Sequence, residues 1–375
     1  MSNYNEIYNY EMPINEYLLK NKEINDDLHR KLSIVYCNNC GHAFNELYND
    51  FLTDDLYTEA PIPANPVSPN MHSRLNNVLD WIGLRYYNKK NVIEIGAGSG
   101  HLSRIIANKA RSVTIYEPCN TLTKTMLPEK NINLFSKNYK YDRTLELFDF
   151  GICRQVIEHI KNPLDFIIEI KKSLKPHGYV YLEVPNAEYI YNNKMIVDFH
   201  FQHVQYFTEH SFLKAIEMAG MQLIKKQYLM DNHDMGFLLK NNMETNNQSK
   251  KNESLKNQNF NNEIIKIRNL LKSIDGSIAL YGANTHGQIF FNLINGVDNN
   301  VAVAFDDSEY LYNYSLFNKN RKLEIINPKA VDINSYNNII ITAYLHQKSI
   351  INNLKELGFD GQIFTMANED IHKGN

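Results

Sequence analysis

Residues 92–102 read Val-Ile-Glu-Ile-Gly-Ala-Gly-Ser-Gly-His-Leu, an apolar strand that runs into a glycine-rich turn and then a helix. Glycine at positions 96, 98 and 100 lets the main chain approach a ligand without a Cβ in the way. Turns of this kind are common between strands and helices, so the spacing alone predicts only a candidate loop for binding a nucleotide. The residues that follow decide which nucleotide the loop fits.

Glu117 ends the next predicted strand, Ser112–Tyr116. In a dinucleotide-type fold, an acidic side chain at this place accepts hydrogen bonds from both hydroxyls of a ribose. A NAD site has the same two features, but the acidic Glu94 and the spacing GxGxG in place of GxGxxG favour S-adenosylmethionine as the cofactor. The residues predicted to surround it here are Glu94, Gly96, Ala97, Gly98, Gly100, Glu117 and Pro118.

Two later segments carry a more specific pattern. Residues 148–160 form an Asp-containing apolar run that continues into Arg-Gln-Val-Ile-Glu-His-Ile, and residues 174–186 read Leu-Lys-Pro-His-Gly before a strand that ends in Pro-Asn. Taken in this order, the segments over about residues 91–186 resemble the class I methyltransferases, which have a Rossmann-like core and use S-adenosylmethionine. The resemblance implies further cofactor contacts from Arg154, Gln155, His159 and, more loosely placed, Asn138.

The flanking motifs resemble a narrower family, the sugar C-methyltransferases of unusual deoxysugar biosynthesis. They are Met-Pro-Ile-Asn at 12–15, a Cys-x-x-Cys at 37–40, Asp-Phe-His-Phe-Gln-His-Val-Gln-Tyr-Phe-Thr at 198–208, and Ala-Leu-Tyr-Gly-Ala-Asn-Thr-His-Gly at 279–287. The family joins a small zinc-binding N-terminal domain, a methyltransferase core and a C-terminal Rossmann-like domain. Its members methylate a keto-deoxysugar linked to a nucleotide, usually dTDP.

This resemblance implies that His203 is a base that removes a proton from the carbon beside the ketone, with Gln202 and Tyr206 at its side. The family has glutamate where this chain has Gln202, and a neutral amide cannot raise the basicity of an imidazole as a carboxylate does. Carbon methylation is the first hypothesis. O- or N-methylation of a sugar or glycan precursor is the second, and a non-catalytic protein that binds the cofactor or a nucleotide is the third. A buried histidine that anchors its segment is the structural alternative for His203.

The predicted contacts with the substrate are His200, Asn186, Tyr281, Asn284 and His286. In the C-terminal unit, the turn at 282–284 follows a strand and opens a helix, whose N-terminal amides are suited to an anion such as the diphosphate of a nucleotide sugar. A degenerate nucleotide-binding fold that only closes the active-site cleft fits the same residues equally well.

Alternating strand and helix signals place these residues on an α/β scaffold. We expect an N-terminal cap at 1–70, irregular and polar, a methyltransferase core at 71–240, a polar linker at 241–262, and a Rossmann-like domain at 263–375. The predicted strands are 91–95, 112–116, 131–135, 148–153, 179–184, 277–281, 301–305 and 338–342. The predicted helical segments are 71–82, 101–109, 121–127, 162–174, 209–219 and 264–274. The four prolines in 60–70 predict an extended connector.

Composition excludes several classes of protein. The net charge of −3 gives no field that favours nucleic acid or an anionic membrane surface, and hydrophobic residues at 43% are sufficient for packed cores. The polar, acidic start and the lack of an apolar run of about 20 residues indicate a cytoplasmic protein without a membrane partner. We expect a monomer or weak dimer whose four cysteines are reduced thiols.

We expect Cys37 and Cys40 to hold well under one zinc ion per chain, because structural zinc normally needs four ligands and no second Cys-x-x-Cys precedes Met12. Elemental analysis of the purified protein measures the zinc content. Stoichiometric zinc that disappears in Cys37→Ser would contradict this expectation, and His29 and His42 would then be the first candidates for the missing ligands.

Overall fold

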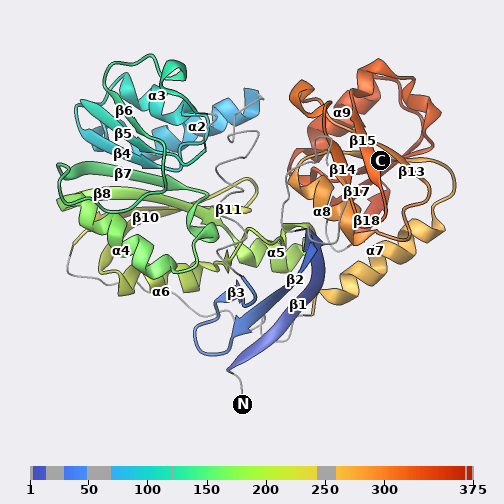
Figure 1. Ribbon diagram of the computed structural model, residues 1–375, viewed down its shortest axis with the longest axis horizontal. Helices are drawn as coiled ribbons and strands as arrows, with labels where there is room; N and C mark the ends of the chain where they lie inside the picture. Colours follow the sequence, from blue (N-terminus) through green and yellow to red (C-terminus); the bar gives the residue numbers. More distant parts are fainter. Residues whose placement is uncertain are drawn as a thin grey trace.

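We describe the protein from a computed structural model, in which residues 3–13, 29–48, 69–119, 122–242, 259–367 and 370–373 are described. Three sheets organise the chain: a small N-terminal sheet lies below and between a central α/β domain and a C-terminal α/β domain (Figure 1). Within the described residues, no helix is long and apolar enough to cross a membrane. Most of the expected linker, from residue 243 to residue 258, lies outside the described residues.

The central sheet has seven strands in the order β10-β11-β8-β7-β4-β5-β6. β11 runs antiparallel to both neighbours, whereas the strands from β8 to β6 pair in parallel. This arrangement is the Rossmann-like core of the class I methyltransferases and confirms the predicted fold class. The strands are β4 (Asn91–Ile95), β5 (Ser112–Tyr116), β6 (Ile132–Phe135), β7 (Phe148–Arg154), β8 (Leu174–Pro185), β10 (Met221–Leu229) and β11 (Asp234–Asn241).

Helices cover both faces of this sheet, which leaves its apolar strands in two buried cores. α2 and α3 pack in one core, and α4 and α6 pack in the other (Figure 1). Leu75, Val78, Leu79 and Ile82 form the buried stripe of α2 that the 3.6-residue period predicts. The prediction of an extended connector over residues 60–70 is wrong at its C-terminal end, because α2 begins at Pro69. Proline is tolerated in the first turn of a helix, since its missing N–H costs no hydrogen bond there. The helices are α2 (Pro69–Ile82), α3 (His101–Ala107), α4 (Pro163–Ser173), α5 (Ala187–Asn193) and α6 (Glu209–Met218).

The expectation of an irregular N-terminal cap is wrong. β1 (Tyr4–Pro13), β2 (His29–Cys37) and β3 (Ala43–Asn45) form an antiparallel sheet, and β9 (Gln205–Tyr206) extends it from the central domain. A bulge between Glu6 and Tyr8 interrupts the two-residue alternation of β1, and β2 is buried over Leu32–Tyr36 without alternating. Both effects remove the period of two by which a strand is recognised in a sequence.

The C-terminal domain is a second α/β unit, as predicted, with the strand order β14-β15-β13-β12-β16-β17-β18. Its parallel centre is flanked by antiparallel pairs at both edges. The strands are β12 (Ile278–Tyr281), β13 (Val301–Phe305), β14 (Ser315–Phe317), β15 (Lys322–Ile326), β16 (Asn338–Ile341), β17 (Gln362–Ala367) and β18 (Asp370–Lys373). The helices are α7 (Asn261–Ser273), α8 (Thr285–Leu293) and α9 (Gln347–Glu356).

Asp198 joins the central and C-terminal domains. It ends the short 3₁₀ helix Ile196–Asp198 and is 4% exposed. Its Oδ1 accepts a hydrogen bond from Nε2 of His286 on α8 at 2.9 Å, and its Oδ2 accepts one from the hydroxyl of Tyr344 at 2.6 Å. His233, in the turn between β10 and β11, places its Nε2 3.8 Å from the same carboxylate.

The protonation states of this junction follow from burial and pairing. Burial alone would raise the pKa of Asp198, but the nearby imidazole of His233 and the hydrogen bond with His286 hold that pKa well below its usual range. Burial alone would lower the pKa of His233, but Asp198 and Asp234 raise it to about 10. The junction therefore contains a buried imidazolium–carboxylate pair at neutral pH.

Replacing Asp198 by asparagine should destabilise the protein by about 3–5 kcal/mol, because it leaves the charge of His233 with one carboxylate fewer inside the structure. Urea denaturation followed by circular dichroism measures this change in the free energy of unfolding. The exposed Asp275→Asn is the matched control and should have almost no effect.

The same pair should make stability depend on pH. A histidine whose pKa is raised by folding contributes stability that is complete below its unfolded pKa of about 6.5 and is lost as the pH rises through its folded value. The free energy of unfolding should therefore fall between pH 6.5 and pH 10, and more steeply in the wild type than in Asp198→Asn. Parallel curves for the two proteins would contradict the pairing.

Candidate functional site

The glycine turn after β4 lies against the loop that follows β7. Gly96, Gly98 and Gly100 have φ values of 74°, 55° and 71°, in the left-handed region that favours glycine. A Cβ on Gly96 would lie 2.3 Å from Cγ2 of Val156, so a larger residue would push the two loops apart. The carboxyl ends of β4, β5 and β7 thus meet at one edge of the sheet, which is where ligands bind in open α/β folds.

Glu117 lies beside this turn, as predicted. Its Oε2 accepts a hydrogen bond from the main-chain N–H of Gly98 at 2.7 Å, and its Oε1 accepts one from that of Cys119 at 2.9 Å. Burial raises the pKa of Glu117, and these two hydrogen bonds oppose the increase. Glu117 therefore couples the turn after β4 to the end of β5.

Glu94 faces inward from β4. The hydroxyl of Ser103 on α3 donates a hydrogen bond to its carboxylate, which is 4% exposed. Burial raises the pKa of Glu94 to about 7. The structure gives Glu94 a role in holding α3 under the glycine turn, and its contact with the cofactor stays a prediction. Ala97 and Pro118 are half-buried in the two loops, and Asn138 is exposed after β6.

Arg154 and Gln155 direct their side chains toward Glu183 on β8. Arg154 makes a bidentate ion pair, with Nε 3.1 Å from Oε2 and Nη2 2.9 Å from Oε1 of Glu183. Gln155 donates from Nε2 to Oε1 of Glu183 at 3.4 Å, and Arg74 forms a second ion pair with that oxygen at 2.8 Å. Burial alone would raise the pKa of Glu183, but Arg154 and Arg74 hold it at about 2. Both predicted cofactor residues thus have a structural partner within the domain.

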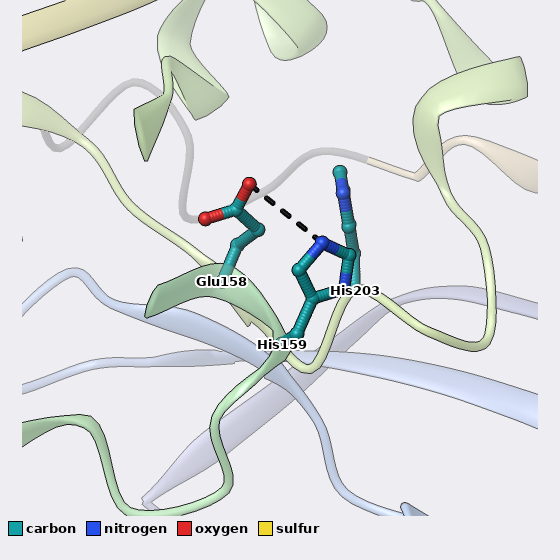
Figure 2. A group of neighbouring side chains, drawn as sticks. All are labelled: Glu158, His159 and His203. Atoms are coloured by element: carbon teal, nitrogen blue, oxygen red, sulfur yellow. Dashed lines mark ion pairs between the residues drawn. The ribbon is translucent and has the colours of Figure 1, made fainter. Parts of the chain in front are cut away.

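Four histidines and a carboxylate gather beyond β7. Glu158 and His159 belong to the 3₁₀ helix Ile157–His159, and His203 lies on the loop before β9 (Figure 2). The ring of His203 has its centroid 3.7 Å from that of His200 and 4.8 Å from that of His159. The junction histidine His233 is close enough to influence the charge of His203. Spacing along the sequence does not point to Glu158, because only the folded chain brings it beside a loop some 45 residues away.

His203 is a neutral imidazole in this surrounding. Burial lowers its pKa well below 6.5, and the neighbouring His200 and His159 lower it further. A neutral imidazole has a nitrogen that can accept a proton, although a lowered pKa makes it a weaker base. The predicted base is therefore in the protonation state that its role requires.

Gln202 and Tyr206 shape the loop that carries His203. The main-chain carbonyl of Gln202 accepts a hydrogen bond from Nδ1 of His159 at 3.0 Å. The hydroxyl of Tyr206 accepts from the main-chain N–H of His200 at 3.2 Å and lies 3.3 Å from its carbonyl oxygen. Tyr206 thus stabilises the fold of this loop, and the catalytic role predicted for it stays a prediction.

Two of the predicted substrate residues have structural partners, and their contact with a substrate stays a prediction. Asn186 is buried and caps α5: its Oδ1 accepts from the N–H of Glu188 at 3.1 Å, and its Nδ2 donates to the carbonyl of Asn232 at 3.0 Å. His286 bonds to Asp198 at the domain junction. Both side chains hold the structure together, and their polar atoms have these partners.

Two carboxylates lie at the turn of the C-terminal domain where an anion site is predicted, and that site stays a prediction. The N–H of Ala283 in the turn donates to Oδ2 of Asp306 at 2.8 Å, and the hydroxyl of Tyr281 donates to Oδ1 of Asp307 at 3.0 Å. Two carboxylates at the turn repel a diphosphate. Asn284 is exposed at the start of α8 and makes no capping hydrogen bond.

The cysteine pair has few potential ligands near it. Oε1 of Gln205 accepts a hydrogen bond from Nε2 of His42 at 2.7 Å, and Nε2 of His29 is 2.9 Å from Oδ1 of Asn292. Among the described residues, no third metal-binding side chain joins Cys37 and Cys40. The zinc content of the pair stays a prediction.

Comparison with known proteins agrees with this geometry. Residues 70–226 match the family model of a methyltransferase domain. The ubiquinone biosynthesis O-methyltransferase of Rickettsia typhi is 28% identical over 122 residues, which are 31% of this chain and 50% of that protein. The relative from Rickettsia bellii is 26% identical over 136 residues, which are 35% of this chain and 53% of that protein. The chain thus spans about half the length of these curated relatives.

Among solved structures, the N-methyltransferase NodS from Bradyrhizobium japonicum in complex with S-adenosyl-L-homocysteine is 14% identical. The similarity has a TM-score of 0.37 and covers 47% of this chain and 89% of that chain. The family match over residues 70–226 shows that the chain contains a methyltransferase domain, whose cofactor is S-adenosylmethionine.

Replacing Glu117 by alanine should weaken the binding of S-adenosylmethionine at least about tenfold, since a charge-assisted hydrogen bond contributes roughly 1.5–3 kcal/mol. Isothermal titration calorimetry measures the affinity. Glu117→Gln keeps one acceptor oxygen for the Gly98 amide and should bind with an intermediate affinity. Unchanged affinity in a folded Glu117→Ala protein would show that this carboxylate does not contact the cofactor.

Proposed function

From the methyltransferase domain of residues 70–226, we propose that the protein transfers the methyl group of S-adenosylmethionine to a small acceptor that binds beside His203. One observation carries the proposal. The loop with His203 and the segment with Glu158 and His159 lie directly beyond β7, at the same sheet edge as the glycine turn and Glu117. An acceptor at these histidines would be close to the methyl donor.

Each part of the site has a defined task in this reaction. When bound, S-adenosylmethionine supplies a methyl group that its sulfonium centre has already activated. Glu117 and the turn 96–100 would hold its ribose and orient it, and His203 would accept the proton that the acceptor loses. His200 and Tyr206 fix the loop that carries His203, which keeps the imidazole in place.

For the acceptor, we propose a nucleotide-linked deoxysugar, methylated at the carbon next to a keto group. The motif at 198–208 and the three-part organisation of the chain support this substrate class, because both resemble the sugar C-methyltransferases. Glu158 adds support. The carbon-methylating motif has a glutamate where this chain has Gln202, and Glu158 places a carboxylate close to His203 from another segment. The two carboxylates at the C-terminal turn leave recognition of the diphosphate to other residues.

Methylation of a hydroxyl is the second candidate. The Rickettsia relatives are O-methyltransferases by name, and Gln202 departs from the glutamate of the carbon-methylating motif. Mass spectrometry of products, after labelled S-adenosylmethionine and a panel of nucleotide sugars are offered, distinguishes carbon from oxygen or nitrogen as the methylated atom. A protein that binds no S-adenosylmethionine in the micromolar to millimolar range, by calorimetry, would not be a methyltransferase of either kind.

Replacing His203 by asparagine should lower turnover about 100-fold to 10,000-fold, the usual contribution of a positioned base, while the affinity for S-adenosylmethionine stays the same. The matched control is His177→Asn, at an exposed position away from the cluster, which should keep wild-type turnover. Wild-type turnover in His203→Asn would leave His203 as a packing residue.

Gln202→Glu should separate the two reactions. A carboxylate at position 202 should raise the rate of carbon methylation, because it increases the basicity of the neighbouring imidazole. An enzyme that methylates oxygen or nitrogen, with a pocket shaped for the neutral amide, should become slower or stay the same. Steady-state rates on the acceptor identified by mass spectrometry test this difference.

A further inference from the structure

Glu158 is a buried carboxylate that no lysine or arginine of the described residues pairs with. It is 1% exposed, and neither of its carboxylate oxygens has a hydrogen-bond partner among the residues that the structure describes. In the described part of the chain, no lysine or arginine forms an ion pair with it, and its ion-pair contact is Nε2 of His159 at 3.8 Å. Buried carboxylates are normally hydrogen-bonded, paired, or bound to a metal ion.

Two imidazoles face this carboxylate. One potential ligand atom from each of Glu158, His159 and His203 lies within 4.8 Å of the other two (Figure 2). Ligands of one zinc ion lie about 3.4 Å apart when the metal–ligand distance is about 2.1 Å, so small side-chain rotations would close the group around an ion. The three side chains come from two segments that the fold holds side by side.

The orientation of His159 matches that of a metal ligand. Its Nδ1 donates a hydrogen bond to the main-chain carbonyl of Gln202 at 3.0 Å, which leaves the lone pair on Nε2, the nitrogen that faces Glu158. Metal-binding histidines usually donate their second nitrogen to a carbonyl or carboxylate in this way, because that bond fixes the tautomer. The carbonyl of Glu158 in turn accepts from the N–H of Val204 at 2.8 Å, which ties the two segments together.

We propose that Glu158, His159 and His203 bind one divalent transition-metal ion of the zinc type. Two imidazoles and one carboxylate are a ligand set for zinc and its neighbours in the first transition row, whereas magnesium and calcium prefer oxygen ligands alone. Three protein ligands leave a coordination position for a further oxygen atom, as in catalytic zinc sites.

The open position gives the ion a role at the acceptor, and this part of the inference rests on the proposed function. A Lewis acid bound to a hydroxyl or keto oxygen of the acceptor would lower the pKa of the acceptor, so that its proton could pass to solvent water, and would stabilise the negative charge that remains. His203 would then act as a ligand, and the ion would supply the activation assigned above to the imidazole. Dependence of turnover on added metal distinguishes the two roles.

The test uses the full chain, freed of metal with a chelator and titrated with zinc chloride by calorimetry. We expect one zinc per chain, with an affinity that falls at least tenfold in Glu158→Gln and in His203→Asn. His72→Asn and Cys37→Ser should leave this site unchanged. These two variants control for zinc bound at other places. His72→Asn removes one ring of the pair His72 and His101, whose ring nitrogens are 2.9 Å apart, and Cys37→Ser removes one thiol of the cysteine pair. Cobalt(II) in place of zinc should give the absorption of nitrogen and oxygen ligands without a thiolate charge-transfer band.

The affinity for S-adenosylmethionine, measured on the same preparations, separates failure of the site from failure of the fold or of the proposed function. Glu158→Gln should keep that affinity while it loses zinc. Absence of a stoichiometric site in the wild type, or zinc that is lost in Cys37→Ser but kept in Glu158→Gln, would overturn the proposal. Zinc binding without any binding of S-adenosylmethionine would sustain the metal site and refute the methyltransferase function.

Discussion

Burial of charged side chains between the central and C-terminal domains constrains the whole arrangement, because an ion inside a protein needs a partner of opposite charge. A continuous series of such partners runs from the central sheet to α8. Its members Arg154, Glu183, Arg74, Asp234, His233 and Asp198 alternate in charge, and His286 on α8 ends the series with a hydrogen bond to Asp198. They come from six segments far apart in the sequence. The series therefore fixes the positions of α2, β8, the β10–β11 turn and the C-terminal domain relative to one another.

This series also sets the electrostatic surroundings of the site. Glu158 and His203 lie near it, and its carboxylates and imidazoles contribute to the pKa shifts of both residues. The members of the series have partners, whereas the carboxylate of Glu158 has no hydrogen bond within the described part of the chain. Glu158 therefore differs from the charged residues that stabilise the domain junction. This difference supports a role for Glu158 at the candidate functional site.

The sequence predicted those parts of the fold that depend on local pattern. The bounds of β4, β5 and β13 match the expected strands, and Glu117 lies beside the glycine turn as expected from its place after β5. The N-terminal sheet was missed because a bulge and continuous burial hide its period. Glu183, Asp198 and Glu158 were missed because their roles come from partners in other segments, which spacing along the chain does not show. Asn186 and Tyr206 were assigned to chemistry by motif, but their contacts are structural.

The loop that carries His203 is continuous with β9, and β9 pairs with β3 of the N-terminal segment. Val204 is the residue next to His203, and its carbonyl accepts a hydrogen bond from the N–H of Asn45 at 2.9 Å. The turn that faces the cofactor, in contrast, is built from residues inside the 70–226 domain. The two halves of the site therefore differ in modularity. In the proposed function, the cofactor would lie within the common fold alone, whereas the acceptor would lie beside a loop whose geometry depends on an N-terminal segment outside that fold. Changes in that segment would then give the chain a route to new acceptors without altering the residues proposed to bind the cofactor.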